Sequence, residues 1–80
     1  MIVANVLAAK GRDVATTTPD RTIAAVASEL ATRRIGALVV TERGRVIGIV
    51  SERDIVRAIG LNGAEILGDP VVSIMTRDVV

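Results

Sequence analysis

The sequence predicts an α/β domain with the element order β-α-β-β-α. Three observations predict this order: a β-branched stretch over residues 14–18, apolar residues at helical spacing over 22–33, and two apolar runs, 37–41 and 45–50, joined by a short turn. A second helical pattern follows from Ser51. Eighty residues make one small domain, and 50% of them are hydrophobic. We therefore expect more apolar surface than one small core can bury, and a partner surface that covers the remainder.

The first strand and the first helix are separated by a proline. Pro19 holds the preceding residue in extended backbone, so the strand over 14–18 ends there. The helix is expected over about 22–33, with Asp20 or Thr22 as its N-cap. Its core-facing residues recur at helical spacing and are Ile23, Val26, Ala27 and Leu30.

The two apolar runs are predicted to form a hairpin around Glu42-Arg43-Gly44, because glycine accepts the positive φ that such turns need. Apolar residues in both strands do not alternate with polar ones, so both faces of the sheet should be covered. The second helix is expected to begin at Ser51 and stop at Gly60, with Ile55, Val56 and Ile59 facing the core. After a glycine-containing loop, Val71 to Met75 is predicted to be another short helix.

The composition excludes several classes of chemistry. Cysteine and histidine are absent, so thiolate catalysis, the usual metal ligands and a histidine general base are missing. Acidic and basic residues are interleaved at a net charge of +1, and aromatic residues are absent, so no nucleic-acid partner is expected. No apolar run approaches a membrane span, and residues 1–5 lack the basic region of a signal peptide. These features predict a cytoplasmic protein with no membrane partner and no metal site.

The junction between the second hairpin strand and the second helix, Gly48 to Asp54, is the strongest candidate site. Ser51 lies where an N-cap belongs, and the helix start offers free backbone N–H groups and the positive end of its dipole to an anion. Asp54 could accept hydrogen bonds from both hydroxyls of a ribose, while Ser51 and Arg53 face phosphate. Alternatively, Ser51 and Asp54 form a capping box that only satisfies the backbone.

The two ends of the chain resemble each other. A short amphipathic helix that Gly11 ends is predicted near the N-terminus, with the apolar residues Ile2, Val3, Val6 and Leu7. Asp78-Val79-Val80 resembles Asp13-Val14-Ala15, about 65 residues earlier, and Val72 to Met75 corresponds to the end of that first helix. This correspondence predicts that a second copy of the same unit starts near the C-terminus.

Four segments, in this order and spacing, resemble the cystathionine-β-synthase domain family, usually called the CBS domain: Val14 to Asp20, Arg34 to Val40, Gly48 to Val56 and Ile74 to Val79. The resemblance implies one complete repeat over residues 1–68, followed by a linker and the start of a second repeat over 69–80. It also implies a CBS-type fold. Family members carry the repeats in tandem pairs called Bateman modules, whose clefts bind adenosine-containing ligands such as AMP, ADP, ATP or NAD and draw on both repeats.

The resemblance also implies ligand-binding residues, which are Thr16, Ile35, Gly36, Ala37, Ser51, Arg53 and Asp54. Thr16 matches a threonine that reaches phosphate or ribose, and the backbone of 35–37 matches a segment that reads the adenine edge. Ser51 and Asp54 match the phosphate-facing hydroxyl and the ribose-binding carboxylate. Three structural alternatives stay open: Thr16 only fills a strand end, Gly36 only ends a helix, and Arg53 is only a solvated side chain.

Two functions from different classes follow. The first is a non-catalytic regulatory module that binds an adenine nucleotide, requires no other cofactor, acts as a homodimer and controls a partner protein. The second is a ligand-free scaffold for dimerisation or protein interaction. An enzyme is disfavoured, because Ser51, Glu52 and Asp54 are the only clustered polar groups and no base, metal ligand or cofactor motif accompanies them.

Overall fold

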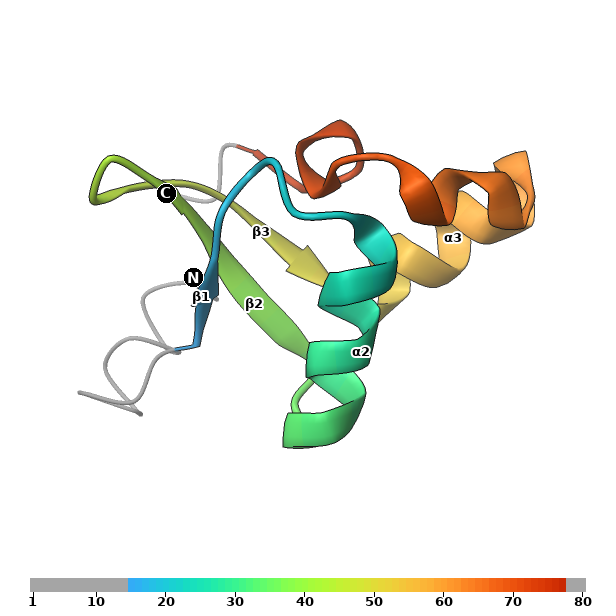
Figure 1. Ribbon diagram of the computed structural model, residues 1–80, viewed down its shortest axis with the longest axis horizontal. Coiled ribbons are helices and arrows are strands. Elements are labelled where there is room, and N and C mark those ends of the chain that lie inside the picture. Colours follow the sequence, from blue (N-terminus) through green and yellow to red (C-terminus); the bar gives the residue numbers. More distant parts are fainter. Residues whose placement is uncertain (1–14, 78–80) are drawn as a thin grey trace.

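The computed structural model describes residues 15–77 and has the predicted element order (Figure 1). Its elements are β1 (Thr16–Thr17), α2 (Ile23–Arg33), β2 (Ala37–Glu42), β3 (Arg45–Ser51) and α3 (Glu52–Asn62), followed by two 3₁₀ turns, Ala64–Gly68 and Val71–Ser73. The sheet has the order β1-β2-β3, with β1 parallel and β3 antiparallel to β2. The predicted N-terminal helix and the resemblance of residues 78–80 to residues 13–15 lie outside the described residues.

Helix α2 begins and ends as predicted, but its C-cap is not a glycine. The Thr22 side chain caps it by accepting a hydrogen bond from the Ala25 N–H at 3.1 Å. At the other end, Arg34 adopts left-handed backbone with φ 57° and donates its N–H to the last carbonyls of the helix. The reading of Gly36 as the helix cap is therefore wrong, because Arg34 takes the left-handed conformation itself.

The core lies between the sheet and the helices. Helix α2 buries Ile23, Val26 and Leu30 against strand residues on one face of the sheet. Residues of the later segments complete this core, so that the whole cluster is Ile23, Val26, Leu30, Leu38, Val40, Val50, Ile55, Val71 and Met75. Three consecutive residues of β2, Leu38 to Val40, are each at most 2% exposed. This confirms that both faces of the central strand are removed from solvent there.

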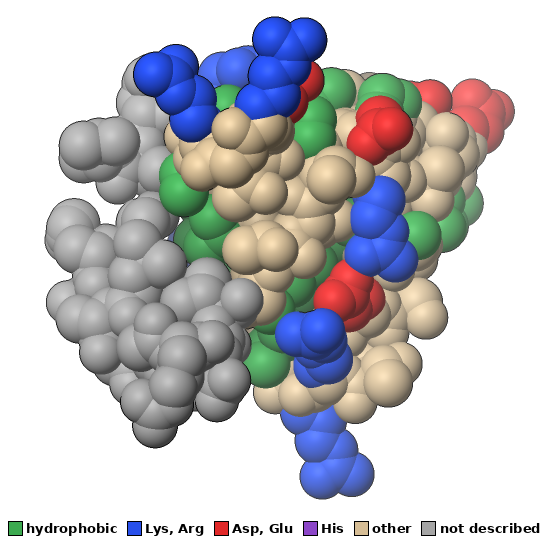
Figure 2. Space-filling view, turned by 60° about the vertical axis from the view of Figure 1, so that its left-hand side comes forward, with side chains coloured by type: hydrophobic (Ala, Val, Ile, Leu, Met, Phe, Trp, Pro, Cys, Tyr) green, Lys and Arg blue, Asp and Glu red, His purple; other side chains and the backbone are tan. Residues whose placement is uncertain are grey.

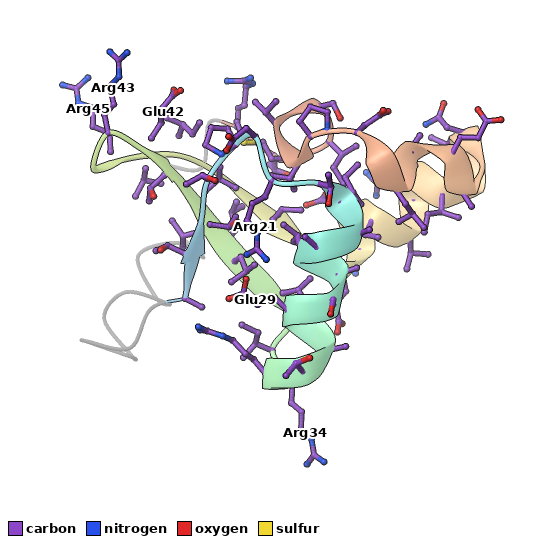
Figure 3. The ribbon with its side chains drawn as sticks, viewed as in Figure 1. Arg21, Glu29, Arg34, Glu42, Arg43 and Arg45 are labelled. Atoms are coloured by element: carbon purple, nitrogen blue, oxygen red, sulfur yellow. The ribbon has the colours of Figure 1, made fainter. Side chains whose placement is uncertain are left out.

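The outer side of α2 carries an ion-pair network. The Arg21 guanidinium pairs with the Glu29 carboxylate, as Figure 3 shows, and Arg33 Nε lies 3.1 Å from the other oxygen of the same carboxylate. The Glu29 side chain is 18% exposed, whereas the Arg21 and Arg33 side chains are 41% and 52% exposed. This pairing ties the loop before α2 to the last turn of the helix, with the modest energy of a partly solvated pair.

The hairpin between β2 and β3 turns through two residues. Arg43 and Gly44 both have positive φ, 54° and 80°, as a tight hairpin turn requires. Glu42 belongs to β2, so the turn is one residue shorter than the predicted Glu42-Arg43-Gly44. Arg43 and Arg45 point outward at the hairpin tip in Figure 3. The prediction of positive φ at Gly44 is confirmed.

Helix α3 continues past Gly60 to Asn62, and Gly63 with φ 87° follows it. The prediction that Gly60 ends the helix is wrong, because the backbone there stays helical and the next glycine takes the turn. The chain then returns toward β3 (orange to red in Figure 1). Its second 3₁₀ turn covers Val71–Ser73 only, so the predicted helix to Met75 is shorter than expected.

The returning chain forms a backbone bridge with β3. Ile49 N–H donates to the Thr76 carbonyl at 3.0 Å, and Thr76 N–H donates to the Ile49 carbonyl at 2.8 Å. Met75, next to it, is buried in the core. Of the helices in residues 15–77, none has the length and apolar character needed to cross a membrane.

Candidate functional site

Two sequence-distant segments meet at one corner of the sheet. Ala37, the first residue of β2, pairs with Ser51, the last residue of β3. Next to this pair, the Gly36 carbonyl accepts a hydrogen bond from the Glu52 N–H at 2.9 Å. The antiparallel register therefore brings Gly36 and Ala37 to the start of α3, where Ser51 and Asp54 lie. Four of the seven residues implied by the family resemblance share this corner.

Ser51 and Asp54 form a complete capping box. The Asp54 N–H donates to Ser51 Oγ at 3.2 Å, while Asp54 Oδ2 accepts from the Ser51 N–H at 2.9 Å and from Ser51 Oγ at 3.1 Å. The capping box that the sequence offered as the alternative to a ligand site is therefore present. Among the described residues, it leaves Oδ1 of the half-buried carboxylate with a single hydrogen bond, from the Thr76 hydroxyl at 3.3 Å. The carboxylate keeps room to accept further hydrogen bonds.

Thr16 lies on the same face of the sheet as this corner but not within it. It pairs with Val39, which pairs with Ile49, and alternation places Ala37 and Ser51 on that same face. Thr16 is exposed and stands two strands from Ser51, about 10 Å across the sheet. An elongated ligand could contact both ends of this face, whereas a single ion could not.

Ile35 and Arg53 flank the corner in different ways. The Ile35 N–H donates to the Leu30 carbonyl at 3.1 Å, and its side chain packs against the core. Because this N–H is already used, adenine could be read here by carbonyl oxygens, which accept from its amino group, rather than by that donor. Arg53 is exposed in the first turn of α3 and makes no ion pair within residues 15–77.

Two surface hollows lie elsewhere. A hollow of about 300 Å³ between α2 and α3 is lined by Ala27, Leu30, Ala31, Glu52, Ile55 and Val56. Another of about 390 Å³ is lined by Pro19, Asp20, Glu42, Ile47, Pro70, Val72 and Arg77. None of the seven implied residues lines either of them.

The charges around the domain are of both signs. On the face in Figure 2, acidic and basic side chains are mixed, with several arginines at its upper edge. Within residues 15–77, no group of three or more acidic side chains is arranged to hold a metal ion. The chemistry available at the corner is hydrogen bonding by two hydroxyls, one carboxylate and backbone groups, with an arginine beside them.

A strand, a helix, an antiparallel hairpin and a capped helix define a small α/β module, of which the described residues form a single repeat. The chain belongs to the CBS domain family, whose family model matches residues 7–61. A 17.7 kDa protein in the bps2 3′ region of Acidianus ambivalens is 39% identical over 79 residues, which cover 91% of this chain and 46% of that protein. The chain thus spans about half the length of this curated relative.

Solved structures show the same fold. The CBS-domain containing protein ATU1752 from Agrobacterium tumefaciens is 46% identical with a TM-score of 0.84, over 98% of this chain and 63% of that one. The CBS domain protein PAE2072 from Pyrobaculum aerophilum, solved in complex with AMP, is 36% identical with a TM-score of 0.73, over 82% of this chain and 51% of that one. These comparisons confirm the CBS-type fold.

Proposed function

We propose that this chain is a non-catalytic regulatory module that binds an adenosine-containing ligand at the corner formed by the start of β2 and the start of α3. The observation that carries the proposal is the pairing of Ala37 with Ser51, which sets Gly36 and the Asp54 carboxylate at one edge. A small residue admits a base, and a carboxylate accepts ribose hydroxyls. The AMP complex of the relative from Pyrobaculum aerophilum supports this ligand class.

The roles of the individual residues follow their positions. Asp54 would hold the ribose, Ser51 and Arg53 would face phosphate, and the backbone of 35–37 would contact adenine. Thr16 would reach the ligand from β1 on the same face of the sheet. We further propose that the module acts in the cytoplasm, where free adenine nucleotides are available to it, and that it regulates a partner protein there.

Clefts in the CBS domain family draw on two repeats, so a second repeat or a second copy of the chain would complete the cleft here. A homodimer that imitates a tandem pair would also bury apolar surface that one repeat leaves uncovered. A specific interface of this kind should exceed about 1,000 Å². Light scattering of the chain tests this directly: we expect a dimer at high micromolar concentration, and a well-folded monomer there would contradict it.

A ligand-free scaffold is the second candidate, favoured by two observations. The capping box already accounts for Ser51 and Asp54 without a ligand. In addition, Val56 and Leu61 on α3 are 69% and 77% exposed, which leaves apolar side chains available for contact with another protein. On this reading the module dimerises or holds a partner, and the corner is only a helix start.

Nucleotide binding decides between the two. The chain contains no Phe, Tyr or Trp, so absorbance near 260 nm in a nucleic-acid-free preparation reports retained nucleotide directly. Thermal unfolding should then be followed with AMP, ATP, GTP and CTP. At a ligand concentration of 100 times Kd, binding adds about 2.7 kcal/mol to the free energy of unfolding.

We expect AMP or ATP to raise the Tm clearly, and GTP and CTP to raise it much less. The carbonyl oxygens near 35–37 suit the amino group of adenine but oppose the O6 acceptor of guanine. Equal shifts with ATP and GTP would leave only a phosphate site. No shift with any adenosine nucleotide, and no retained nucleotide, would favour the scaffold.

A further inference from the structure

Thr76 reaches the candidate site from outside the β-α-β-β-α unit. Its backbone bridges Ile49 of β3 through two hydrogen bonds of 2.8 and 3.0 Å, and its Oγ1 donates to Asp54 Oδ1 at 3.3 Å. The two residues are 22 positions apart in sequence. Gly48 makes this approach feasible, because a Cβ there would lie 2.8 Å from the Thr76 carbonyl oxygen. The segment that leaves the repeat is thus joined to the carboxylate at the corner.

The hydrogen-bonding capacity of Asp54 decides what Thr76 does when a ribose arrives. A carboxylate has about four lone-pair positions. Hydrogen bonds within residues 15–77 take three of them: Oδ2 accepts from the Ser51 N–H and the Ser51 hydroxyl, and Oδ1 accepts from the Thr76 hydroxyl. This leaves one position on Oδ1 among these residues, whereas a ribose offers two hydroxyls.

The Ser51 hydroxyl can supply the second position. It accepts from the Asp54 N–H, so its oxygen can stay in place while its proton turns toward a phosphate. This frees one position on Oδ2. Asp54 then accepts one ribose hydroxyl on each oxygen, with the Ser51 N–H still on Oδ2 and the Thr76 hydroxyl still on Oδ1. All four positions are filled, and Thr76 does not have to leave.

We propose that Thr76 is a positioning residue of the nucleotide site: its hydroxyl holds Asp54 in the orientation that accepts both ribose hydroxyls, and so couples the segment leaving the repeat to ligand binding. The inference rests on the proposed function. Because coupling is reciprocal, a ribose on Asp54 also favours docking of the Thr76 segment on β3. Ligand binding at the corner would thereby change how firmly the segment after the repeat is docked on β3.

The test is titration of two ligands into four proteins, monitored by calorimetry. The proteins are wild type, Thr76→Val, Thr76→Ser and Ser73→Ala. Thr76→Val keeps the side-chain shape and removes the donor, while Thr76→Ser restores it. Ser73→Ala is the matched control, because Ser73 Oγ donates to the Pro70 carbonyl in the same segment and has no contact with Asp54. The ligands are AMP and 2′,3′-dideoxy-AMP, which lacks both ribose hydroxyls.

We expect Thr76→Val to raise the Kd for AMP about three- to tenfold, the size of a typical net hydrogen-bond contribution, because the lost bond orients Asp54 and does not itself contact AMP. Thr76→Ser and Ser73→Ala should bind AMP as wild type does, and all four proteins should bind 2′,3′-dideoxy-AMP alike. This pattern locates the effect at the ribose hydroxyls, which a general loss of structure would not do.

Three results would overturn the inference while leaving the proposed function intact. They are an unchanged Kd for AMP in Thr76→Val, tighter AMP binding in that variant, and equal weakening toward both ligands. Tighter binding would mean that Thr76 competes with the ribose. Failure of wild type to bind AMP at all overturns the proposed function, and the inference with it, before any variant is compared.

Discussion

Gly48 and Met75 are packed so closely that a Cβ on Gly48 would lie 2.8 Å from the methionine sulfur and 2.8 Å from the neighbouring carbonyl oxygen of Thr76. The sulfur can move with its flexible side chain, but the carbonyl belongs to a bridged backbone. Gly48→Ala should therefore force the returning segment away from β3 and lower the free energy of unfolding by about 1–3 kcal/mol. Urea denaturation measures this free energy. A decrease of less than a few tenths of a kcal/mol would show that the returning segment is not held against β3.

Gly60 offers the matched opposite case within α3. Nothing lies within 4 Å of a Cβ built there, and the backbone is helical. Gly60→Ala should raise the free energy of unfolding by about 0.5–1 kcal/mol, because alanine loses less backbone entropy in a helix. The same urea series measures it. Destabilisation by this exchange would mean that α3 ends at Gly60 after all.

Thr17 and Thr16 are neighbours in β1 with opposite surroundings. The Thr17 side chain is 5% exposed, and its Oγ1 has no hydrogen-bond partner in the described part of the chain. Thr17→Val removes a buried, unpaired hydroxyl at constant shape and should stabilise the domain by about 1 kcal/mol. Thr16→Val, at the exposed position, should change the stability by less than about 0.5 kcal/mol. A less stable Thr17→Val variant would reveal a partner for the hydroxyl, such as a buried water.

A substitution at Gly36 distinguishes an effect on stability from an effect on ligand binding. A Cβ there meets no atom of residues 15–77 within 4 Å, and its φ is not in the left-handed region. Gly36→Ala should leave the Tm without ligand nearly unchanged, and it should weaken AMP binding if the base approaches this backbone. Thermal unfolding with and without AMP gives both values in one experiment. Unchanged AMP binding would remove residue 36 from the base contact.

Asp54→Asn separates capping from ribose binding. Loss of the charged cap should lower the free energy of unfolding by a few tenths to about 1 kcal/mol. The amide accepts at one atom only, so AMP affinity should fall by about 1.5–3 kcal/mol, while adenine without ribose should bind both proteins alike. Calorimetric titration measures the affinities. If AMP binds measurably and with equal affinity to both proteins, Asp54 does not hold the ribose, and Ser51 and Asp54 only cap the helix.

The local features of the fold were predictable from residues close together in sequence. Thr22 caps α2 and Ser51 caps α3, since each signal involves a side chain and an N–H three residues later. The end of α3 and the residue that caps α2 were less predictable. Gly60 resembles a stop signal, yet α3 continues to Asn62 and Gly63 follows it with positive φ. Helix α2 ends at Arg33 as predicted, but Arg34 and not Gly36 takes the left-handed conformation.

Local sequence patterns were enough to predict the element order, the burial of both faces of the central strand and the residue types at the corner, because these features depend on short-range periodicity and side-chain type. Three relationships became known only from the tertiary structure: Ala37 pairs with Ser51, Thr16 lies two strands from Ser51, and Thr76 contacts Asp54. Gly48 was an available signal, because an isolated glycine in a strand marks a close approach of backbone. This glycine does not indicate which segment approaches. The contact between Thr76 and Asp54 joins residues 22 positions apart, and its geometry depends on the strand register and on the burial of Met75, which no local pattern encodes.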